Sequence, residues 1–303
     1  MNFKRAIAGP LLSIVFLVIF LYMISGVKLI FENYQQNEKN IASASVADSV
    51  QNIFEEPDIH AQSAISVWTD LSGQSDKVLF SKNEQRILSV ASISKLMTAL
   101  VVVENSDLSQ KITISDKSAN QSKDSEPLKA GETYFAKDLL YTMLIGSDNT
   151  ASYALSESIG ADKFVGLMNE KTKELGLSDT SFENPTGLGL ENFSTAHDLA
   201  KLAEYLLKEH SSILAITTTP EFNLYSADGK IMHEIINTDK LLNDSSDLAE
   251  RIIGGKTGDT RTAGKCLLLV VTSPDNQGYF INVILNSNDR FGEMKKLINR
   301  YAN

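Results

Sequence analysis

Residues 88–104 read LSVASISKLMTALVVVE, and this stretch decides the fold. Its apolar residues recur at intervals of three and four, which predicts a helix from Ser92 to about Glu104 with one buried face. The recurring apolar positions are Ile93, Leu96, Met97, Leu100 and Val101. Ser92 lies in the first turn, where its hydroxyl meets the positive end of the helix dipole, and Lys95 follows three residues later on the same face.

Strand patterns surround this helix on both sides in the sequence. Residues 64–68 and 77–80 read as a hairpin across the turn-rich segment 70–74, and apolar β-rich runs return at 265–272 and 279–285. Helical patterns cover 137–145, 150–159, 161–175, 195–208 (capped by Ser194 or Thr195) and 290–301. This order predicts an α+β fold in which both chain ends build one antiparallel sheet and helices pack over it.

Composition narrows the class of protein. The chain has 303 residues, of which 43% are hydrophobic, and this is enough for one domain with a core and a cleft. A net charge of -10 repels phosphate backbones, so we expect no nucleic-acid partner. The single cysteine, Cys266, has no intrachain partner for a disulfide and reads as a small buried hydrophobe in a strand.

The N-terminal segment predicts an anchored, outward-facing protein. Lys4 and Arg5 precede an uncharged apolar stretch from Ala6 to Ser25, long enough to cross a hydrocarbon core of roughly 30 Å. We therefore expect a single-pass protein of the cytoplasmic membrane. Its predicted parts are a cytoplasmic tail (1–5), a transmembrane anchor or uncleaved signal (6–27), a flexible polar linker (28–57) and an extracytoplasmic catalytic domain (58–303).

Three short motifs carry the chemistry: Ser92-Ile93-Ser94-Lys95, Ser147-Asp148-Asn149 and Lys256-Thr257-Gly258. A serine hydroxyl is a weak nucleophile until a base takes its proton, and no histidine is evidently placed to do so. Lys95 is the candidate base. Burial beside a second cation, Lys256, would lower its pKa and leave a neutral amine.

The other candidates follow from what acyl transfer requires. Ser147 would pass a proton to the leaving amine, and Asn149 would hold the substrate amide and the Lys95 amine in register. Residues 256–258 and Thr260 would bind the substrate, with hydroxyls offered to its carboxylate. The backbone N–H groups of Ser92 and Asp259 are the candidate oxyanion donors.

Taken together, the motifs resemble those of the penicillin-binding proteins and serine β-lactamases, and most of all the low-molecular-mass D-alanyl-D-alanine carboxypeptidases. Further matching stretches are 128–132, 138–140, 184–188, 194–200, 255–260 and 263–266. The resemblance implies a β-lactamase/transpeptidase-like fold with an all-helical subdomain. It also implies an acyl-enzyme on Ser92, release of the terminal D-alanine from peptidoglycan stem peptides, and covalent inhibition by β-lactams, with no metal and no cofactor.

Departures from the family pattern keep alternatives open. The family's middle motif usually reads Ser-Gly-Asn, whereas Ser147-Asp148-Asn149 is common in class A β-lactamases; however, no Glu-x-x-Leu-Asn stretch follows to supply their deacylating carboxylate. The family often has His at Thr186 and a basic residue near Thr238, which leaves Arg261 as a faint candidate for binding the substrate carboxylate. A non-catalytic peptidoglycan-binding scaffold is the third interpretation.

Two other kinds of site are disfavoured. Glu250 stands where a phosphate-binding loop before Lys256 would need its first glycine, so no nucleotide is expected. The four histidines show no paired metal-ligand spacing and no Gly-x-Ser-x-Gly elbow accompanies them, so surface or structural roles are predicted.

Overall fold

The computed structural model describes residues 28, 56–72, 76–121 and 128–301, so the predicted anchor and most of the predicted linker lie outside the described residues. Within the described part of the chain, no helix is both long and apolar enough to cross a membrane. The chain separates into compact units at Glu56/Pro57, and the following description concerns the unit from Pro57 onward.

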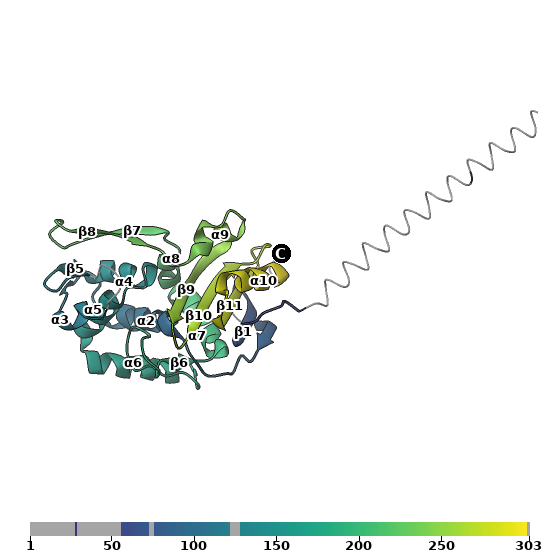
Figure 1. The fold of residues 1–303 in the computed structure, drawn as a ribbon, viewed down its shortest axis with the longest axis horizontal. Helices are drawn as coiled ribbons and strands as arrows, with labels where there is room; N and C mark the ends of the chain where they lie inside the picture. Colours follow the sequence, from purple (N-terminus) through teal and green to yellow (C-terminus); the bar gives the residue numbers. More distant parts are fainter. Residues whose placement is uncertain (1–27, 29–55, 73–75, 122–127, 302–303) are drawn as a thin grey trace, which may run out of the picture. The chain divides into compact units, whose positions relative to one another are not determined.

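A five-stranded antiparallel sheet with the order β2-β1-β11-β10-β9 forms the centre of this unit (Figure 1). Its strands are β1 (Ser63–Asp70), β2 (Asp76–Lys82), β9 (Ile252–Thr260), β10 (Gly264–Thr272) and β11 (Gly278–Ser287). The two ends of the domain meet where β1 pairs with β11, as the order of elements predicted. β9 is an edge strand, so one row of its backbone groups does not pair within the sheet.

The two faces of the sheet belong to different apolar clusters, because successive side chains of a strand point to opposite faces. On β10, Leu267 and Leu269 pack with α10 (Arg290–Tyr301), whereas Leu268 and Val270 pack with the helical part of the domain. Figure 1 shows α10 over one face of the sheet and α7 (Ala196–Glu209) across the other. Helices therefore pack against both faces of the sheet.

The helical part surrounds α2 (Lys95–Asn105), most of whose side chains are buried. The short 3-10 helix η1 (Ala91–Ser94) leads directly into α2. The other helices are α3 (Asp116–Ala119), α4 (Ala136–Ile145), α5 (Asn149–Ile159), α6 (Ala161–Glu174), α8 (Ser211–Thr217), η2 (Lys240–Asn243) and α9 (Leu248–Arg251). Small two-stranded pairs complete the fold: β3 (Leu88–Ser89) with β6 (Phe193–Ser194), β4 (Lys111–Thr113) with β5 (Thr133–Phe135), and β7 (Glu221–Tyr225) with β8 (Met232–Ile236).

The sequence prediction is confirmed for an antiparallel sheet with helices packed over it, and the bounds of the closing helix agree with α10. It missed β9 as a strand, because glycines interrupt its apolar pattern. Those glycines fit a crowded site: a Cβ on Gly254 would lie 2.6 Å from the Leu214 side chain, and one on Gly255 would lie 2.5 Å from the Leu268 carbonyl oxygen. The β7–β8 hairpin was missed as well.

Candidate active site

Ser92 lies in η1, at a tightly constrained junction. The preceding residue, Ala91, has φ +49°, in the left-handed region that non-glycine residues rarely adopt. Gly187 packs against this turn so closely that a Cβ there would lie 2.0 Å from the Ala91 carbonyl oxygen. The surrounding structure thus fixes a strained turn, which sets the direction in which the Ser92 hydroxyl points.

Lys95 is fully buried, and its amine lies at hydrogen-bond distance from three oxygens. Nζ is 3.0 Å from Ser92 Oγ, 2.7 Å from Asn149 Oδ1 and 2.7 Å from the Thr186 carbonyl oxygen. A carbonyl oxygen only accepts hydrogen bonds, so Asn149 and Thr186 take both N–H groups of a neutral amine. The lone pair is then left for the Ser92 hydroxyl. After a proton transfer, the ammonium would donate to all three oxygens without any rearrangement.

The loop at residues 184–187 supplies one of these acceptors. Asn184 Oδ1 accepts hydrogen bonds from the Thr186 backbone N–H (3.0 Å), the Thr186 hydroxyl (2.7 Å) and the Gly187 N–H (3.0 Å). The Pro185 carbonyl oxygen accepts from Thr98 Oγ1 on α2 (2.7 Å) and Ser152 Oγ on α5 (2.6 Å). The loop is therefore clamped to both helices. Sequence analysis matched this stretch to the family but assigned it no role.

The middle motif spans the turn between α4 and α5. Asp148 is the N-cap of α5 and accepts a hydrogen bond from the Ala151 N–H at 2.7 Å. Burial raises the pKa of its carboxyl group, while hydrogen bonds and the nearby Lys95 oppose the shift. Ser147 has φ +61°, so this turn is strained as well. Asn149 accepts a hydrogen bond from Lys95 directly, whereas no hydrogen bond joins the Ser147 and Ser92 side chains in the described part of the chain.

Lys256 lies on β9 with only 2% of its surface exposed, and its Nζ donates to the Thr257 carbonyl oxygen at 3.2 Å. Burial lowers the pKa of Lys256 to about 7; Asp239 opposes this shift and Arg290 adds to it. Burial also lowers the pKa of Lys95 far below its ordinary value, and the charge of Lys256 lowers it further. The sequence predicted this arrangement, in which burial and the charge of a second lysine both favour the neutral form of the Lys95 amine.

The remaining predicted substrate-binding residues lie near the end of β9. Thr257 Oγ1 is 2.6 Å from Thr238 Oγ1, so these two hydroxyls form one hydrogen-bonded unit. Thr260 Oγ1 accepts from the Ala263 N–H at 3.0 Å, and the faint candidate Arg261 is exposed. Residue 238 thus places a hydroxyl, not a cation, beside the predicted substrate-binding residue Thr257.

Gly258 brings the two candidate oxyanion donors together. A Cβ on Gly258 would lie 2.8 Å from the Val90 carbonyl oxygen and 3.3 Å from the Ser92 backbone nitrogen. The backbone of β9 therefore approaches η1 as closely as only glycine permits. This contact places the Asp259 N–H, one peptide unit further along the edge strand, beside the turn that carries Ser92.

The cysteine and the histidines, for which the sequence predicted surface or structural roles, have the following surroundings. Cys266 is buried, and burial raises the pKa of its thiol to about 11, so it remains a thiol at neutral pH. His197 Nδ1 lies 3.6 Å from Asp198 Oδ1, and His210 Nε2 lies 3.5 Å from Glu104 Oε1. Among residues 56–72, 76–121 and 128–301, no group of three or more His, Cys, Asp or Glu side chains is arranged to hold a metal ion.

Comparison with known proteins identifies the family. A family model described as D-alanyl-D-alanine carboxypeptidase matches residues 50–289. The chain belongs to this family. The resemblance read from the motifs is confirmed, and the match extends over all three of them.

Two curated members show how similar the chain is to its family. It is 36% identical over 215 residues to the D-alanyl-D-alanine carboxypeptidase DacF of Bacillus subtilis, covering 68% of this chain and 53% of that protein. It is 34% identical over 201 residues to a D-alanyl-D-alanine endopeptidase of Pseudomonas aeruginosa, covering 65% and 63%. The chain thus matches between one half and two thirds of the length of these relatives.

Solved structures share the fold. A D-alanyl-D-alanine carboxypeptidase from Mycobacterium tuberculosis superposes with a TM-score of 0.71 at 27% identity, covering 81% of this chain and 92% of that one. The ampicillin-bound penicillin-binding protein D2 from Listeria monocytogenes gives a TM-score of 0.68 at 25% identity, covering 81% and 99%. The fold is therefore that of the penicillin-binding DD-peptidases.

Proposed function

We propose that the chain is a serine-type D-Ala-D-Ala carboxypeptidase that removes the terminal D-alanine of peptidoglycan stem peptides. One observation carries the proposal: the amine of Lys95 is fully buried, has carbonyl acceptors for two N–H groups, and lies 3.0 Å from Ser92 Oγ. An uncharged amine held in this way is a general base directed at a nucleophile.

The reaction would follow from these contacts. Ser92 Oγ attacks the carbonyl carbon of the penultimate D-alanine while its proton passes to Lys95 Nζ. The backbone N–H groups of Ser92 and Asp259 stabilise the tetrahedral oxyanion. When the C–N bond breaks, the departing amine of D-alanine takes a proton through the Ser147 hydroxyl. Water then attacks the Ser92 ester, which releases the shortened peptide and restores the hydroxyl.

Substrate binding would use the edge of β9. The hydroxyls of Thr257 and Thr260 and the Lys256 amine face the terminal carboxylate, and Asn149 holds the substrate amide. β-Lactams would acylate Ser92 by the same attack, as the ampicillin-bound relative suggests. No cofactor takes part in this scheme. We further propose that residues 6–27 anchor the protein in the cytoplasmic membrane with residues 58–303 on the outer side, a proposal that rests on the charge pattern of the N-terminal sequence.

Endopeptidase action on cross-linked peptides is the second candidate. It is favoured by the likeness to the Pseudomonas endopeptidase and by Thr238, which replaces a basic residue at the carboxylate end of the cleft. The two substrates differ in the leaving group and share the acyl group. Both activities would therefore use the same Ser92 ester.

The test compares the wild-type protein with Ser92→Ala. Wild-type protein should be labelled covalently by fluorescent penicillin and should release D-alanine from a stem pentapeptide, and the variant should do neither while keeping its unfolding temperature. A cross-linked muropeptide dimer measures the endopeptidase candidate in the same assay. Labelling that persists in Ser92→Ala would remove the proposed nucleophile, and fast nitrocefin hydrolysis without D-alanine release would identify a β-lactamase instead.

A further inference from the structure

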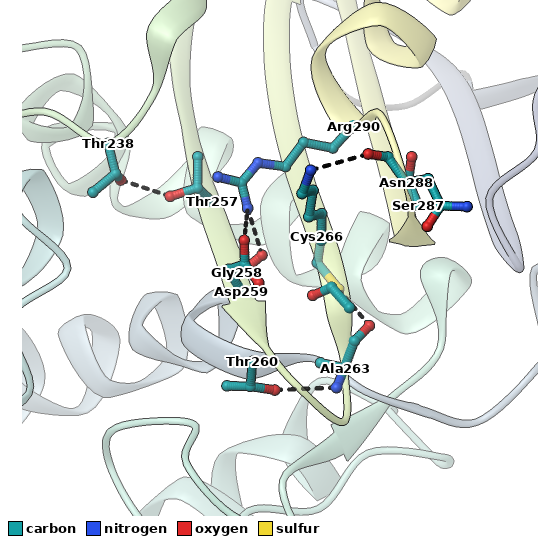
Figure 2. Close-up of polar contacts among 12 residues, drawn as sticks. Thr238, Thr257, Gly258, Asp259, Thr260, Ala263, Cys266, Ser287, Asn288 and Arg290 are labelled. Carbon is teal, nitrogen blue, oxygen red and sulfur yellow. Dashed lines mark hydrogen bonds and ion pairs between the residues drawn. The ribbon is translucent and has the colours of Figure 1, made fainter.

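Arg290 begins α10, directly after β11, and its side chain extends to β9 (Figure 2). Its Nη1 donates a hydrogen bond of 2.7 Å to the Gly258 carbonyl oxygen and lies 3.6 Å from Asp259 Oδ2. Only 13% of the Arg290 side chain is exposed, against 56% for Asp259. The hydrogen bond to the Gly258 carbonyl oxygen is therefore better shielded from solvent than the ion pair with Asp259. Arg290 was not among the site residues predicted from the sequence.

The contacted carbonyl shares a peptide unit with the Asp259 N–H. This peptide is trans, since the described residues contain no cis peptide bond, and in a trans peptide the C=O and N–H bonds point in opposite directions. Arg290 follows β11, which lies on the inner side of the edge strand β9, so the carbonyl oxygen that it contacts faces that side. The N–H of the same peptide therefore points out from the edge of β9, toward the turn that carries Ser92.

The contact also affects the strength of that N–H as a donor. A hydrogen bond from a guanidinium is charge-assisted, and hydrogen bonds in a chain polarise one another, so electron density drawn toward the carbonyl oxygen leaves the N–H more positive. A fixed positive charge one peptide unit away also favours the negative oxygen of a tetrahedral intermediate. The same charge lies close enough to Lys256 to contribute to its lowered pKa.

We infer that Arg290 is a positioning residue for the oxyanion hole: it fixes and polarises the Gly258–Asp259 peptide so that the Asp259 N–H is aligned before a substrate binds. This inference rests on the acyl-enzyme chemistry of the proposed function. It assigns a catalytic consequence to a residue that approaches Ser92 only through the backbone of β9.

The test uses Arg290→Met, which removes the charge and the donor, and Arg290→Lys, which keeps the charge. Arg251→Met is the matched control, because Arg251 also donates to a backbone carbonyl oxygen of this sheet, that of Thr272, through Nε (3.1 Å) and Nη2 (2.9 Å). Acylation is measured with two peptide esters that have the same acyl group. One leaving group carries a free carboxylate and the other carries its amide.

Arg290→Met should slow acylation about tenfold to a hundredfold with both esters, a smaller effect than outright removal of an oxyanion donor. Arg290→Lys should recover part of the loss, and Arg251→Met should leave acylation within about threefold of wild type. The carbonyl stretching frequency of the isotopically labelled acyl-enzyme should rise in Arg290→Met, because the ester carbonyl is less strongly hydrogen-bonded. If Arg290→Met does not fold, the same frequency is measured in Arg290→Lys, where a smaller rise is expected.

Two results would overturn the inference. A loss of acylation rate confined to the ester with the free carboxylate would make Arg290 a carboxylate-binding residue. An equal loss of rate in Arg251→Met, or an unchanged carbonyl frequency in Arg290→Met, would mean that the contact only links α10 to β9. Failure of wild-type protein to form any acyl-enzyme is a separate outcome, since it removes the proposed function itself.

Discussion

Replacing Asn184 with Ala tests whether the 184–187 loop sets the geometry of the general base. The change removes the oxygen that accepts hydrogen bonds of 3.0, 2.7 and 3.0 Å from Thr186 and Gly187. At about 0.5–1.5 kcal/mol net for each bond, the free energy of unfolding should fall by about 2–4 kcal/mol. For a domain of this size, that corresponds to a drop of about 4–16 °C in unfolding temperature.

The kinetic consequence follows from Thr186, whose carbonyl oxygen is 2.7 Å from Lys95 Nζ. Without the Asn184 turn this acceptor is no longer fixed. Loss of one hydrogen bond to a charged group costs about 1.5–3 kcal/mol, which corresponds to acylation about 10–100 times slower. The assay is the second-order rate of labelling by fluorescent penicillin, measured at a temperature where the variant is fully folded.

Asn169→Ala is the matched control for this prediction. Asn169 binds the Phe182 backbone through its Oδ1 (2.9 Å) and Nδ2 (2.7 Å), a similar set of bonds that does not involve Lys95. The control should lose comparable stability and keep its acylation rate. Wild-type labelling by folded Asn184→Ala would refute the reasoning, because the loop would then hold the chain without directing the amine.

Three further predictions follow from the charges and strain around Ser92. Acylation requires neutral Lys95, so its rate should rise with pH through the lowered pKa of that amine. Lys256→Met removes a like charge, which should raise the pKa of Lys95 and move this rise in rate to higher pH, whereas Lys256→Arg keeps the charge and should not. A pH profile of penicillin labelling measures both variants. Gly187→Ala combines φ +84° with a Cβ 2.0 Å from the Ala91 carbonyl oxygen, so thermal unfolding should show a loss of about 2–6 kcal/mol. Ser147→Gly relieves the strain of φ +61° in the folded state but gives the unfolded chain more freedom, so the free energy of unfolding in urea should stay within about 1 kcal/mol of wild type. D-alanine release should fall about 10²–10⁴-fold, because the hydroxyl proposed to transfer the proton is lost.

Local pattern was enough to predict that the candidate nucleophile and its candidate base lie side by side. Ser92 and Lys95 are three residues apart at the start of a helix, so helical spacing brings them together whatever the rest of the chain does. The same kind of information gave α10 and the pairing of the two chain ends, because their apolar periods are strong. Asn149 and Lys256 are distant from Lys95 in the sequence, and only the fold brings them near it. Their prediction therefore needed the ordered set of motifs.

Two contacts that sequence reasoning missed join a backbone carbonyl oxygen to a distant side chain. Lys95 binds the Thr186 carbonyl oxygen across 91 positions, and Arg290 binds the Gly258 carbonyl oxygen across 32. Every residue has a carbonyl group, so an acceptor of this kind leaves no signature in residue identity. The β9 strand was missed for a related reason: the glycines that allow close approach also remove the apolar alternation by which a strand is recognised.

The Ser147-Asp148-Asn149 form of the middle motif, which had suggested a β-lactamase, has a structural explanation. Asp148 caps α5, the helix that begins with Asn149, and in doing so helps to hold the amide that binds Lys95. The Asp148 carboxylate is opposite in charge to the Lys95 ammonium, so it opposes the lowering of the Lys95 pKa that burial and Lys256 produce. Asp148 would therefore stabilise the protonated amine that forms as Ser92 attacks.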